Sequence, residues 1–522
     1  MIAEPSAAVH VRALDPVEFL ERAAFVYPER LAVIDGDAQR TYPEFLARVR
    51  RFAAGLQAMG IGNGERVAVL APNVSIALEA ANAVPLAGGV LCALNTRLAP
   101  EEIDYILGHC GASVLFYDPE LEPLVERLES RIPRVREYET FLAESDPDAL
   151  APHRAGEDET ISINYTSGTT GKPKGVMYTY RGAYLNALAE VVHANLRPES
   201  VYLWTLPMFH CNGWCFPWAV TAVGATHVCL RKVDAPNINR AIREDGVTHF
   251  CAAPTVLIAL ANHPETVAFP RRVIVTTAGA PPSPTTIEQV EGLGAEIHHV
   301  YGLTETYGPI TECAWHSPDW DVLPAHRRAW LRSRQGVPMV TLGANDVRVV
   351  DTELRDVPAD GTTHGEIVMR GNNVMKGYYD DPAATARAFA GGWFHSGDIA
   401  VRHPDGYIEI VDRSKDVIIS GGENISTQQV EKVLLEHDAV LEVAVVAIPD
   451  EKWGEVPKAF VTLKPGRTLD AEELRLFARE RIAAFKVPKA YEFCDLPKTS
   501  TGKIQKYVLR EREWTGRTKR VN

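Results

Sequence analysis

Short apolar runs alternate with amphipathic segments along most of the chain. Residues 75–84 and 287–293 repeat apolar positions at helical spacing, and strand-length apolar runs lie between such segments. These runs are residues 66–70, 113–116, 273–276 and 297–300. Continuous apolar runs are typical of parallel strands that are buried on both faces and joined by crossover helices. The pattern therefore predicts a layered α/β fold in which helices cover parallel sheets.

The pattern changes twice towards the C-terminus. Residues 365–370 and 407–411 are strand-like and lie close to turn residues, which predicts a small antiparallel or barrel-like part. A compact segment of roughly 110 residues follows Asp412, which is large enough for a separate α+β domain. Its expected elements are strand 417–420, helix 427–435, strands 441–448 and 458–463, and helix 471–484. The expected organisation is an N-terminal domain over residues 1–411, a connection over 412–415 and a C-terminal domain over 416–522.

Composition narrows the kinds of partner that the chain can bind. The chain has 522 residues, of which 46% are hydrophobic, enough for more than one core. Lys and Arg number 54 against 68 Asp and Glu, so the formal net charge is −14 at pH 7. This charge provides no global basic field for nucleic acid, and no apolar run approaches the roughly 20 residues of a membrane span. We therefore expect small-molecule substrates, without nucleic acid as a partner.

Eight scattered cysteines without a C-x-x-C pair indicate reduced thiols and a cytoplasmic protein. The N-terminal sequence M-I-A-E-P-S-A-A-V-H has no signal-peptide pattern, and the C-terminal R-T-K-R-V-N is not a peroxisomal S-K-L address. Cys211 and Cys215 lie close to His210, but no second cluster supplies the further ligands that a zinc site requires.

Residues 165–176, Y-T-S-G-T-T-G-K-P-K-G-V, form the pattern that indicates chemistry most clearly. The segment combines hydroxyl donors, glycines that let backbone N–H groups approach an anion, and two cations. These are Thr166, Ser167, Thr169 and Thr170, then Gly168, Gly171 and Gly175, then Lys172 and Lys174. A Walker loop is excluded because only two residues separate Gly168 from Gly171, where that loop has four, and Pro173 follows Lys172. The segment therefore predicts a different cradle for polyphosphate.

Four further motifs follow in order along the chain. They are Y-G-L-T-E-T-Y-G-P at residues 301–309, G-W-F-H-S-G-D at 392–398, V-D-R-S-K-D-V-I-I at 411–419 and P-K-T-S-T-G-K-I at 497–504. With the phosphate segment, this series resembles the adenylate-forming superfamily, which includes acyl-CoA synthetases, carrier-loading adenylation domains and beetle luciferases. The resemblance covers essentially the whole chain.

The resemblance implies a two-step ligase. A carboxylate is a poor electrophile, so its oxygen first attacks the α-phosphate of ATP to give acyl-AMP and pyrophosphate. The thiol of CoA then displaces AMP to give acyl-CoA. Such a phosphoryl transfer depends on alignment and on neutralising the charge that develops at phosphorus. The resemblance therefore implies ATP, Mg²⁺ and CoA as the cofactors. Acyl-CoA products imply a role in fatty acid metabolism.

The resemblance also assigns roles to residues of the motifs. Residues 166–174 hold the β- and γ-phosphates, Thr304 reaches the α-phosphate and Glu305 binds Mg²⁺. The expected contacts to adenine and ribose are Tyr301, Gly302, Gly279, Ala280, Asp398 and Arg413. Lys503 stabilises the adenylation transition state, so Lys503, Thr304 and Glu305 are the expected catalytic residues. The local sequence alone favours a solvated loop lysine at position 503, and the five ordered motifs reverse that interpretation.

The C-terminal domain of this superfamily is mobile. The resemblance places the hinge at Lys415, although the run D-R-S-K-D at 412–416 also fits a solvated turn. Rotation about Lys415 would remove Lys503 and present another face to CoA. The expected CoA contacts are Gly421, Gly422, Glu423 and Trp453.

Residues 206–218, L-P-M-F-H-C-N-G-W-C-F-P-W, are unusually apolar and aromatic. The resemblance places the acyl pocket beside them, with His210 and Trp214 as the expected lining. The segment is similar to the branch that uses short-chain, medium-chain or aromatic acids, including methylthiopropionate. An alternative interpretation makes Trp214 and Phe216 core residues of a buried helix. The base that activates the CoA thiol stays open, with His210 as one candidate.

Other functions share parts of this pattern. A carrier-loading enzyme acting on a separate carrier would use the same first step, as would luciferase-like oxygen chemistry. A nucleotide-binding relative without catalysis is disfavoured because Glu305, Asp398, Arg413 and Lys503 are all present. The sequence leaves the oligomeric state open and is compatible with a homo-oligomer.

Overall fold

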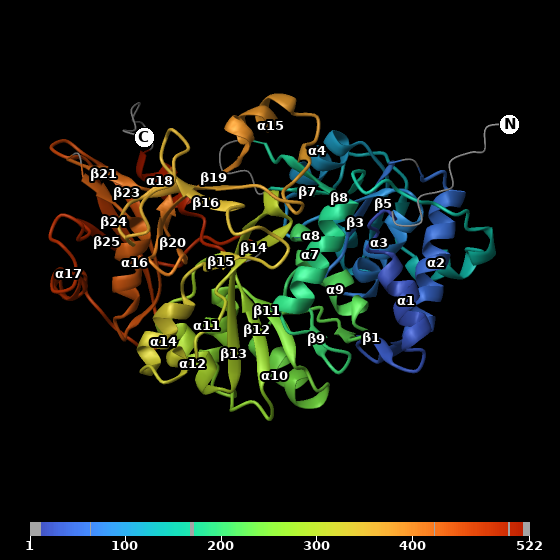
Figure 1. The fold of residues 1–522 in the computed structure, drawn as a ribbon, viewed down its shortest axis with the longest axis horizontal. Helices are drawn as coiled ribbons and strands as arrows, with labels where there is room; N and C mark the ends of the chain where they lie inside the picture. The colour runs from blue at the N-terminus through green and yellow to red at the C-terminus, as the bar shows by residue number, and fades with distance from the viewer. Residues whose placement is uncertain (1–11, 63, 167–171, 422, 500–501, 515–522) are drawn as a thin grey trace.

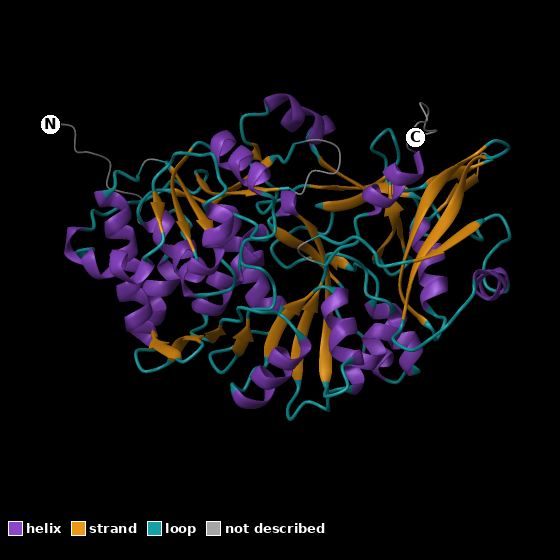
Figure 2. Cartoon of the chain, turned by 180° about the vertical axis from the view of Figure 1, so that it is seen from behind, coloured by secondary structure: helices purple, strands orange, loops and turns teal. Residues whose placement is uncertain are grey.

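The computed structural model describes residues 12–62, 64–166, 172–421, 423–499 and 502–514. Two large mixed sheets, a small antiparallel sheet and a C-terminal sheet follow one another across the molecule (Figure 1). Helices cover the sheets on both sides, as the view from behind also shows (Figure 2). This arrangement confirms the predicted layered α/β fold with a smaller α+β C-terminal part.

The first large sheet has seven strands in the order β18-β8-β7-β4-β3-β5-β6. The strands are β3 (Arg66–Leu70), β4 (Val90–Ala93), β5 (Ala112–Tyr117), β6 (Arg134–Val135), β7 (Thr160–Tyr165), β8 (Gly175–Thr179) and β18 (Gly377–Tyr378). The helices of this region are α1 (Glu18–Val26), α2 (Tyr42–Ala58), α3 (Ser75–Leu86), α4 (Pro100–Cys110), α5 (Glu122–Val125), α6 (Tyr138–Glu144) and α7 (Tyr180–His193), with short 3₁₀ turns at Pro119–Leu121 and Pro147–Ala149. Strands β3 to β7 are parallel, and β8 returns antiparallel to β7. The loop between β7 and β8 is therefore the predicted phosphate segment.

The second large sheet has nine strands in the order β15-β14-β13-β12-β11-β9-β10-β1-β2. The strands are β1 (Leu31–Asp35), β2 (Ala38–Thr41), β9 (Val201–Leu203), β10 (Thr226–Val228), β11 (His249–Ala252), β12 (Val273–Thr277), β13 (Ala295–Leu303), β14 (Gly308–Glu312) and β15 (Val337–Pro338). The other elements of this region are α8 (Cys211–Trp214), α9 (Phe216–Ala222), α10 (Ala235–Glu244), α11 (Pro254–Asn262), α12 (Pro284–Gly292), α13 (Pro318–Asp321), α14 (Ala325–Arg332) and a 3₁₀ turn at Thr304–Thr306. The central strands are parallel, so their carboxyl ends share one edge, where β13 leads into the T-E-T turn.

The predicted small antiparallel part is a four-stranded sheet in the order β16-β17-β19-β20. Its strands are β16 (Val347–Val350), β17 (Gly365–Met369), β19 (Phe394–Arg402) and β20 (Ile408–Arg413), and α15 (Pro382–Ala388) and a 3₁₀ turn at Ala390–Gly392 precede β19. Strand β20 continues through Asp412 and Arg413. Of the expected connection, Ser414 and Lys415 therefore lie beyond the strand.

The C-terminal sheet contains β21 (Ile418–Ser420), β22 (Glu423–Ile425), β23 (Val440–Asp450), β24 (Gly454–Leu463) and β25 (Ala490–Phe493), with α16 (Thr427–Leu435), α17 (Ala471–Arg479) and α18 (Lys506–Trp514). Its core includes Val430, Leu434, Val445 and Val461. The prediction of a helix over 471–484 was too long, because α17 ends at Arg479 and the chain then turns so that Ile482 packs on this core.

Helix α16 begins at a side-chain cap that also ties the C-terminal part to β20. Ser426 Oγ accepts the N–H of Gln429 at 3.0 Å and donates to the carbonyl of Val411 at 2.6 Å. Further along α16, Lys432 Nζ lies 2.8 Å from Glu409 Oε1 on β20. A capping hydroxyl stabilises a helix by about 0.5–2 kcal/mol, so Ser426 fixes where α16 starts.

Within the described residues, no helix has both the length and the apolar character needed to cross a membrane.

Candidate active site

Tyr301, Asp398 and Arg413 come together from three strands. Asp398 on β19 lies opposite Arg413 on β20 in the antiparallel register. The hydroxyl of Tyr301 donates to Asp398 Oδ2 at 2.7 Å, and Arg413 Nε lies 3.3 Å from Asp398 Oδ1. Burial and the adjacent carboxylate hold the pKa of Tyr301 well above its ordinary value, so the phenol stays a donor. The structure therefore unites three of the residues predicted to contact adenine and ribose.

Two tyrosines hold the T-E-T turn in place. Tyr178 donates its hydroxyl to the carbonyl of Thr304 at 2.6 Å, and Tyr378 donates to Glu305 Oε1 at 2.9 Å. Tyr178 itself stacks on Tyr307, with ring centroids 3.7 Å apart. Neither Tyr178 nor Tyr378 was predicted, because both lie outside the motifs and are brought together only by the pairing of β8 with β18.

The described ends of the phosphate segment close on each other. The N–H of Thr166 donates to the carbonyl of Lys174 at 3.0 Å, and the N–H of Lys174 donates to Thr166 Oγ1 at 3.3 Å. Lys174 Nζ lies 4.7 Å from the ring centroid of Tyr378, and Lys172 Nζ lies 5.1 Å from that of Tyr105. The residues between them, Ser167, Gly168, Thr169, Thr170 and Gly171, lie outside the described residues. Tyr378 thus links a predicted phosphate contact, Lys174, to the predicted metal ligand, Glu305.

The backbone at Gly302 admits no side chain. A Cβ on Gly302 would overlap the carbonyl of Gly308, because the β13–β14 pairing shifts register beside Tyr301 and brings the two backbones together. A close backbone approach of this kind is possible only with glycine.

We predict that Gly302→Ala reduces adenylation more than tenfold, because the two backbones must separate and displace Tyr301 and Thr304. Pyrophosphate–ATP exchange measures the loss. Gly292→Ala is the matched control, since a Cβ there has no heavy atom within 4 Å. Equal activity of the two variants would contradict the prediction.

Gly279 and Ala280 follow β12 at its carboxyl end and are exposed. Gly279 has φ of +89°, and a Cβ there would meet no atom within 4 Å. The two residues thus leave open space at the strand edge that also carries Tyr301.

Lys503 lies over the N-terminal domain. Its loop is closed by the N–H of Thr499, which donates to the carbonyl of Lys503 at 2.7 Å. A Cβ on Gly502 would overlap Thr255 Oγ1 on α11, so the loop touches the N-terminal domain directly. Burial and the nearby Arg413 guanidinium lower the pKa of Lys503 to about 7, although Asp398 opposes that shift. The structure therefore places Lys503 near Asp398 and Arg413. Thr255 was not predicted.

Lys415 lies between β20 and β21. Burial and the adjacent Arg413 lower the pKa of its amine. The N–H groups of Asp416 and Val417 donate to the carbonyl of Arg413, and Arg510 donates to the carbonyl of Lys415 at 3.1 Å. The connection is a short hydrogen-bonded turn, so a change of orientation would concentrate in few backbone torsions.

The predicted CoA contacts gather on the C-terminal sheet. Gly421, with φ of +60°, donates its N–H to the carbonyl of Trp453 at 2.8 Å, and a Cβ there would crowd the indole at 2.6 Å. Glu423 and Trp453 are both exposed. Gly422 lies outside the described residues.

His210 and Trp214 lie close to the T-E-T motif. Burial, together with the cation of Lys503, lowers the pKa of His210 to about 4, so the imidazole is neutral at pH 7. Trp214 is 6% exposed, and a Cβ on Gly308 would lie 3.1 Å from it. Phe216 is fully buried and stacks on Tyr202 at 4.8 Å, and both Trp214 and Phe216 belong to the main hydrophobic core, as the alternative interpretation expected.

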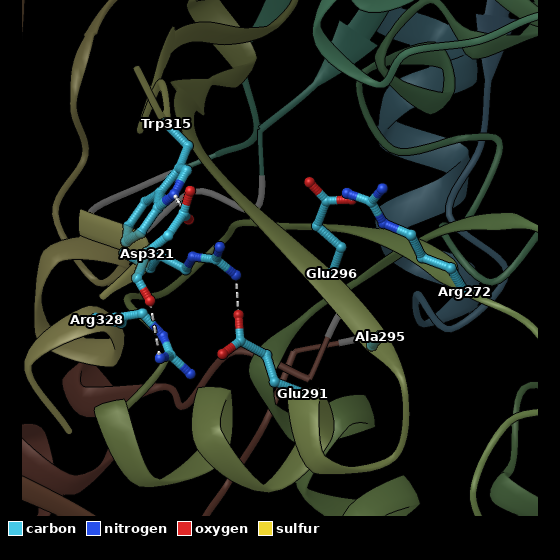
Figure 3. Close-up of a pocket in the computed structure, with 8 residues that line it drawn as sticks. Arg272, Glu291, Ala295, Glu296, Trp315, Asp321 and Arg328 are labelled. Carbon is cyan, nitrogen blue, oxygen red and sulfur yellow. Dashed lines mark hydrogen bonds and ion pairs between the residues drawn. The ribbon is translucent and has the colours of Figure 1, made fainter. Parts of the chain in front are cut away.

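A hollow of about 560 Å³ lies away from these residues (Figure 3). Arg332 contacts Glu291 and covers the ring of Trp315 at 4.2 Å, and Trp315 Nε1 donates to Asp321 at 2.8 Å. Its arginines Arg272, Arg328 and Arg332 thus contact acceptors of the protein itself. The Trp315 segment is therefore a packed aromatic and ionic cluster between α12 and α14.

Comparisons with known proteins agree with this geometry. The model of the AMP-binding enzyme family matches residues 20–379, and that of the AMP-binding enzyme C-terminal domain matches residues 429–503. The chain is 48% identical to an acetate–CoA ligase of Humulus lupulus, over 97% of this chain and 96% of that protein. It is 46% identical to a peroxisomal acetate/butyrate–CoA ligase of Arabidopsis thaliana, over 97% and 95%. The ATP-bound crystal structure of MatB from Rhodopseudomonas palustris superimposes with a TM-score of 0.85 at 26% identity, over 96% and 99%.

The fold and the assembled motifs define an ATP-dependent adenylate-forming enzyme. The chain belongs to the AMP-binding enzyme family. Within that family it is an acyl-CoA synthetase, which uses ATP and CoA to convert a carboxylic acid to its thioester.

Proposed function

We propose that this ligase activates short-chain carboxylic acids and that the residues assembled above carry the chemistry. The observation that supports the roles is that Lys503, from the C-terminal domain, lies near the Asp398–Arg413 pair of strands β19 and β20. The relatives named for acetate and butyrate support a short acid. The bulk of Trp214 beside Gly308 would limit the length of the acyl chain.

In the first step, Asp398 and Arg413 position the ribose while Tyr301 lies against adenine. Thr304 meets the α-phosphate, and Lys172, Lys174 and the loop between β7 and β8 hold the leaving pyrophosphate. Lys503 places its ammonium over the α-phosphate and the attacking carboxylate, where charge develops. Rotation of the C-terminal domain about Lys415 then brings the 421–423 segment and Trp453 to the CoA channel.

Mg²⁺ fits the Glu305 region chemically. One or two carboxylates with phosphate oxygens and water form the usual magnesium environment, and Glu305 stands near Lys174 through their shared neighbour Tyr378. When bound, Mg²⁺ neutralises phosphate charge. Glu305 would hold it, and Tyr378 would keep the carboxylate directed towards the phosphate segment.

The test is acyl-CoA formation with straight-chain acids from acetate to decanoate, with benzoate, cinnamate and methylthiopropionate in the same panel. We expect acid-dependent release of pyrophosphate and AMP, a maximum between acetate and hexanoate, and thioester only when CoA is present. A maximum at an aromatic or long-chain acid would refute the proposed substrate class. Pyrophosphate release that CoA does not affect would favour a carrier-loading enzyme instead.

The lowered pKa of Lys503 predicts a pH dependence of the first step. Because the charged form acts, kcat/KM for ATP should fall as pH rises through about 7, where the free enzyme loses that proton. The Lys503→Arg enzyme keeps its charge throughout this range, so its kcat/KM for ATP should depend less on pH. Ionisation of ATP affects both enzymes alike, so the difference between their pH profiles reports residue 503. Parallel profiles of the two enzymes would contradict the prediction.

The chain is also proposed to work in a reducing compartment such as the cytoplasm. Its eight cysteines are free, and six of them are buried.

A further inference from the structure

Residues 211–215 form a left-handed turn beside the predicted acyl pocket. The φ angles of Cys211, Asn212, Gly213, Trp214 and Cys215 are +44°, +43°, +56°, +52° and +63°. Four of the five are not glycine, and successive L-residues avoid this conformation because Cβ crowds the following carbonyl. Strain of this kind persists only where the surrounding structure imposes it, and it is concentrated at functional sites.

The side chain of Asn164 imposes the first part of this turn. Of the two possible orientations of this amide, one satisfies both its oxygen and its nitrogen, and we assign that orientation from the surrounding donors and acceptors. In it, the amide oxygen accepts the N–H groups of Cys211 at 2.9 Å and of Asn212 at 2.7 Å. Its amide nitrogen donates to Asn212 Oδ1 at 2.6 Å. Asn164 is 2% exposed and lies on β7, two residues before Thr166. One buried amide thus connects the strand of the phosphate segment to the strained turn.

Other contacts join the turn to the T-E-T motif. Asn186 on α7 donates to Cys215 Sγ at 3.6 Å and to the carbonyl of Tyr307 at 3.0 Å. The thiol of Cys211 donates to Thr304 Oγ1 at 3.7 Å. A Cβ on Gly308 would lie 3.1 Å from Trp214, so the indole rests on the chain just after this motif. The turn therefore stands between Asn164 and the residues proposed to act on the α-phosphate.

We propose that Asn164 is a positioning residue that sets which acids the enzyme accepts. It holds the left-handed turn, and the turn holds Trp214 against Gly308 next to His210. Without the amide, residues 211–215 can relax towards the right-handed conformation, which turns the side chains of the segment to new directions. Trp214 would then lose its contact with Gly308 and would no longer limit the length of the acyl chain in the proposed pocket. This inference rests on the proposed acid-activating function.

The experiment compares Asn164→Asp with Asn164→Leu in acyl-CoA formation from acetate to hexanoate. A carboxylate still accepts both backbone N–H groups, and Asn212 can reorient its amide to donate to it, so N164D should keep the wild-type chain-length profile. Leucine has similar size but no acceptor. N164L should therefore raise the KM for the preferred acid about tenfold or more, since two buried N–H groups lose their partner, and should flatten the profile. The KM for ATP should rise less than the KM for the acid, because, among the described residues, only the Cys211–Thr304 hydrogen bond joins the turn to a proposed ATP contact.

Asn239→Leu is the matched control for replacing a buried, hydrogen-bonded asparagine by leucine. Asn239 is 4% exposed on α10 and donates to Thr266 Oγ1 at 2.8 Å, away from the site. We expect N239L to lower thermal stability without changing acid selectivity. An N164L profile that matches N239L, or an N164D enzyme as impaired as N164L, would overturn the proposal.

A second-site variant tests the role even where N164L folds poorly. In N164L/N212G, glycine accepts the positive φ of position 212 and removes the orphaned Asn212 side chain. Folding and the acid KM should both recover towards wild type. A double variant as defective as N164L would refute the role of Asn164. Wild-type enzyme that forms no thioester from any acid would instead refute the proposed function.

Discussion

Lys503→Met should lower the rate of acyl-adenylate formation about 10²- to 10³-fold, the usual effect of removing one group that stabilises developing charge. The side chain of methionine preserves length and packing against the loop, but it brings no charge to Asp398 and Arg413. Pyrophosphate–ATP exchange reports this step. Thioester formation from preformed acyl-AMP should stay within about threefold of wild type, because Lys503 is proposed to act only in the first orientation.

Lys498→Met is the matched control for this substitution. Lys498 belongs to the same loop and lies 2.7 Å from Glu442, within the C-terminal domain. A partly exposed pair of this kind contributes little, so K498M should exchange pyrophosphate at close to the wild-type rate. Equal losses in both half-reactions of K503M would show that Lys503 supports the fold or both orientations, and would contradict a role confined to adenylation.

Glu305→Gln should reduce adenylation about 10²-fold and raise the Mg²⁺ concentration needed for half-maximal rate. The amide retains the shape of the carboxylate and can still accept a hydrogen bond from Tyr378, whereas its neutral oxygen is a weaker ligand for a hard cation. Initial rates of pyrophosphate release over a Mg²⁺ titration measure both effects.

Tyr378→Phe provides a graded comparison, since it removes one hydrogen bond to Glu305 and retains the carboxylate. We expect a loss of several-fold, in line with one hydrogen bond to a charged acceptor. An E305Q enzyme with wild-type Mg²⁺ dependence would remove Glu305 from the metal site. A Y378F loss larger than that of E305Q would show that Tyr378 acts on more than this carboxylate.

The same geometry bears on the order of the two steps. Lys503 reaches the site while Trp453 and Glu423 are exposed on the C-terminal sheet. Lys503, Trp453 and Glu423 all belong to the small C-terminal domain. The proposed second step needs Trp453 and Glu423 at the site in place of Lys503. This arrangement is the one that the proposed first step requires, and rotation at Lys415 is proposed for the second.

Much of the fold was predictable because its signals are local. Strand β3 spans the predicted residues 66–70, and α16 spans the predicted residues 427–435. Apolar runs that must be buried on both faces, and a helix that starts at the Ser426 cap, are specified by neighbours in the sequence. The end of α17 was predicted five residues too late, because packing of Ile482 on the core decides it.

The sequence by itself determined the class of chemistry, because a non-Walker phosphate segment and four ordered motifs make it resemble the adenylate-forming superfamily. Only the tertiary structure decided how these groups meet. Strand pairing brings Tyr178 and Tyr378 to the T-E-T turn, and the placement of the C-terminal domain brings Thr255 to the loop of Lys503. The side chain of Asn164 on β7 contacts the turn at residues 211–215. The lowered pKa values of Lys503 and His210 likewise need burial. Burial and contacts between distant segments are properties of the folded chain, and no local pattern encodes them.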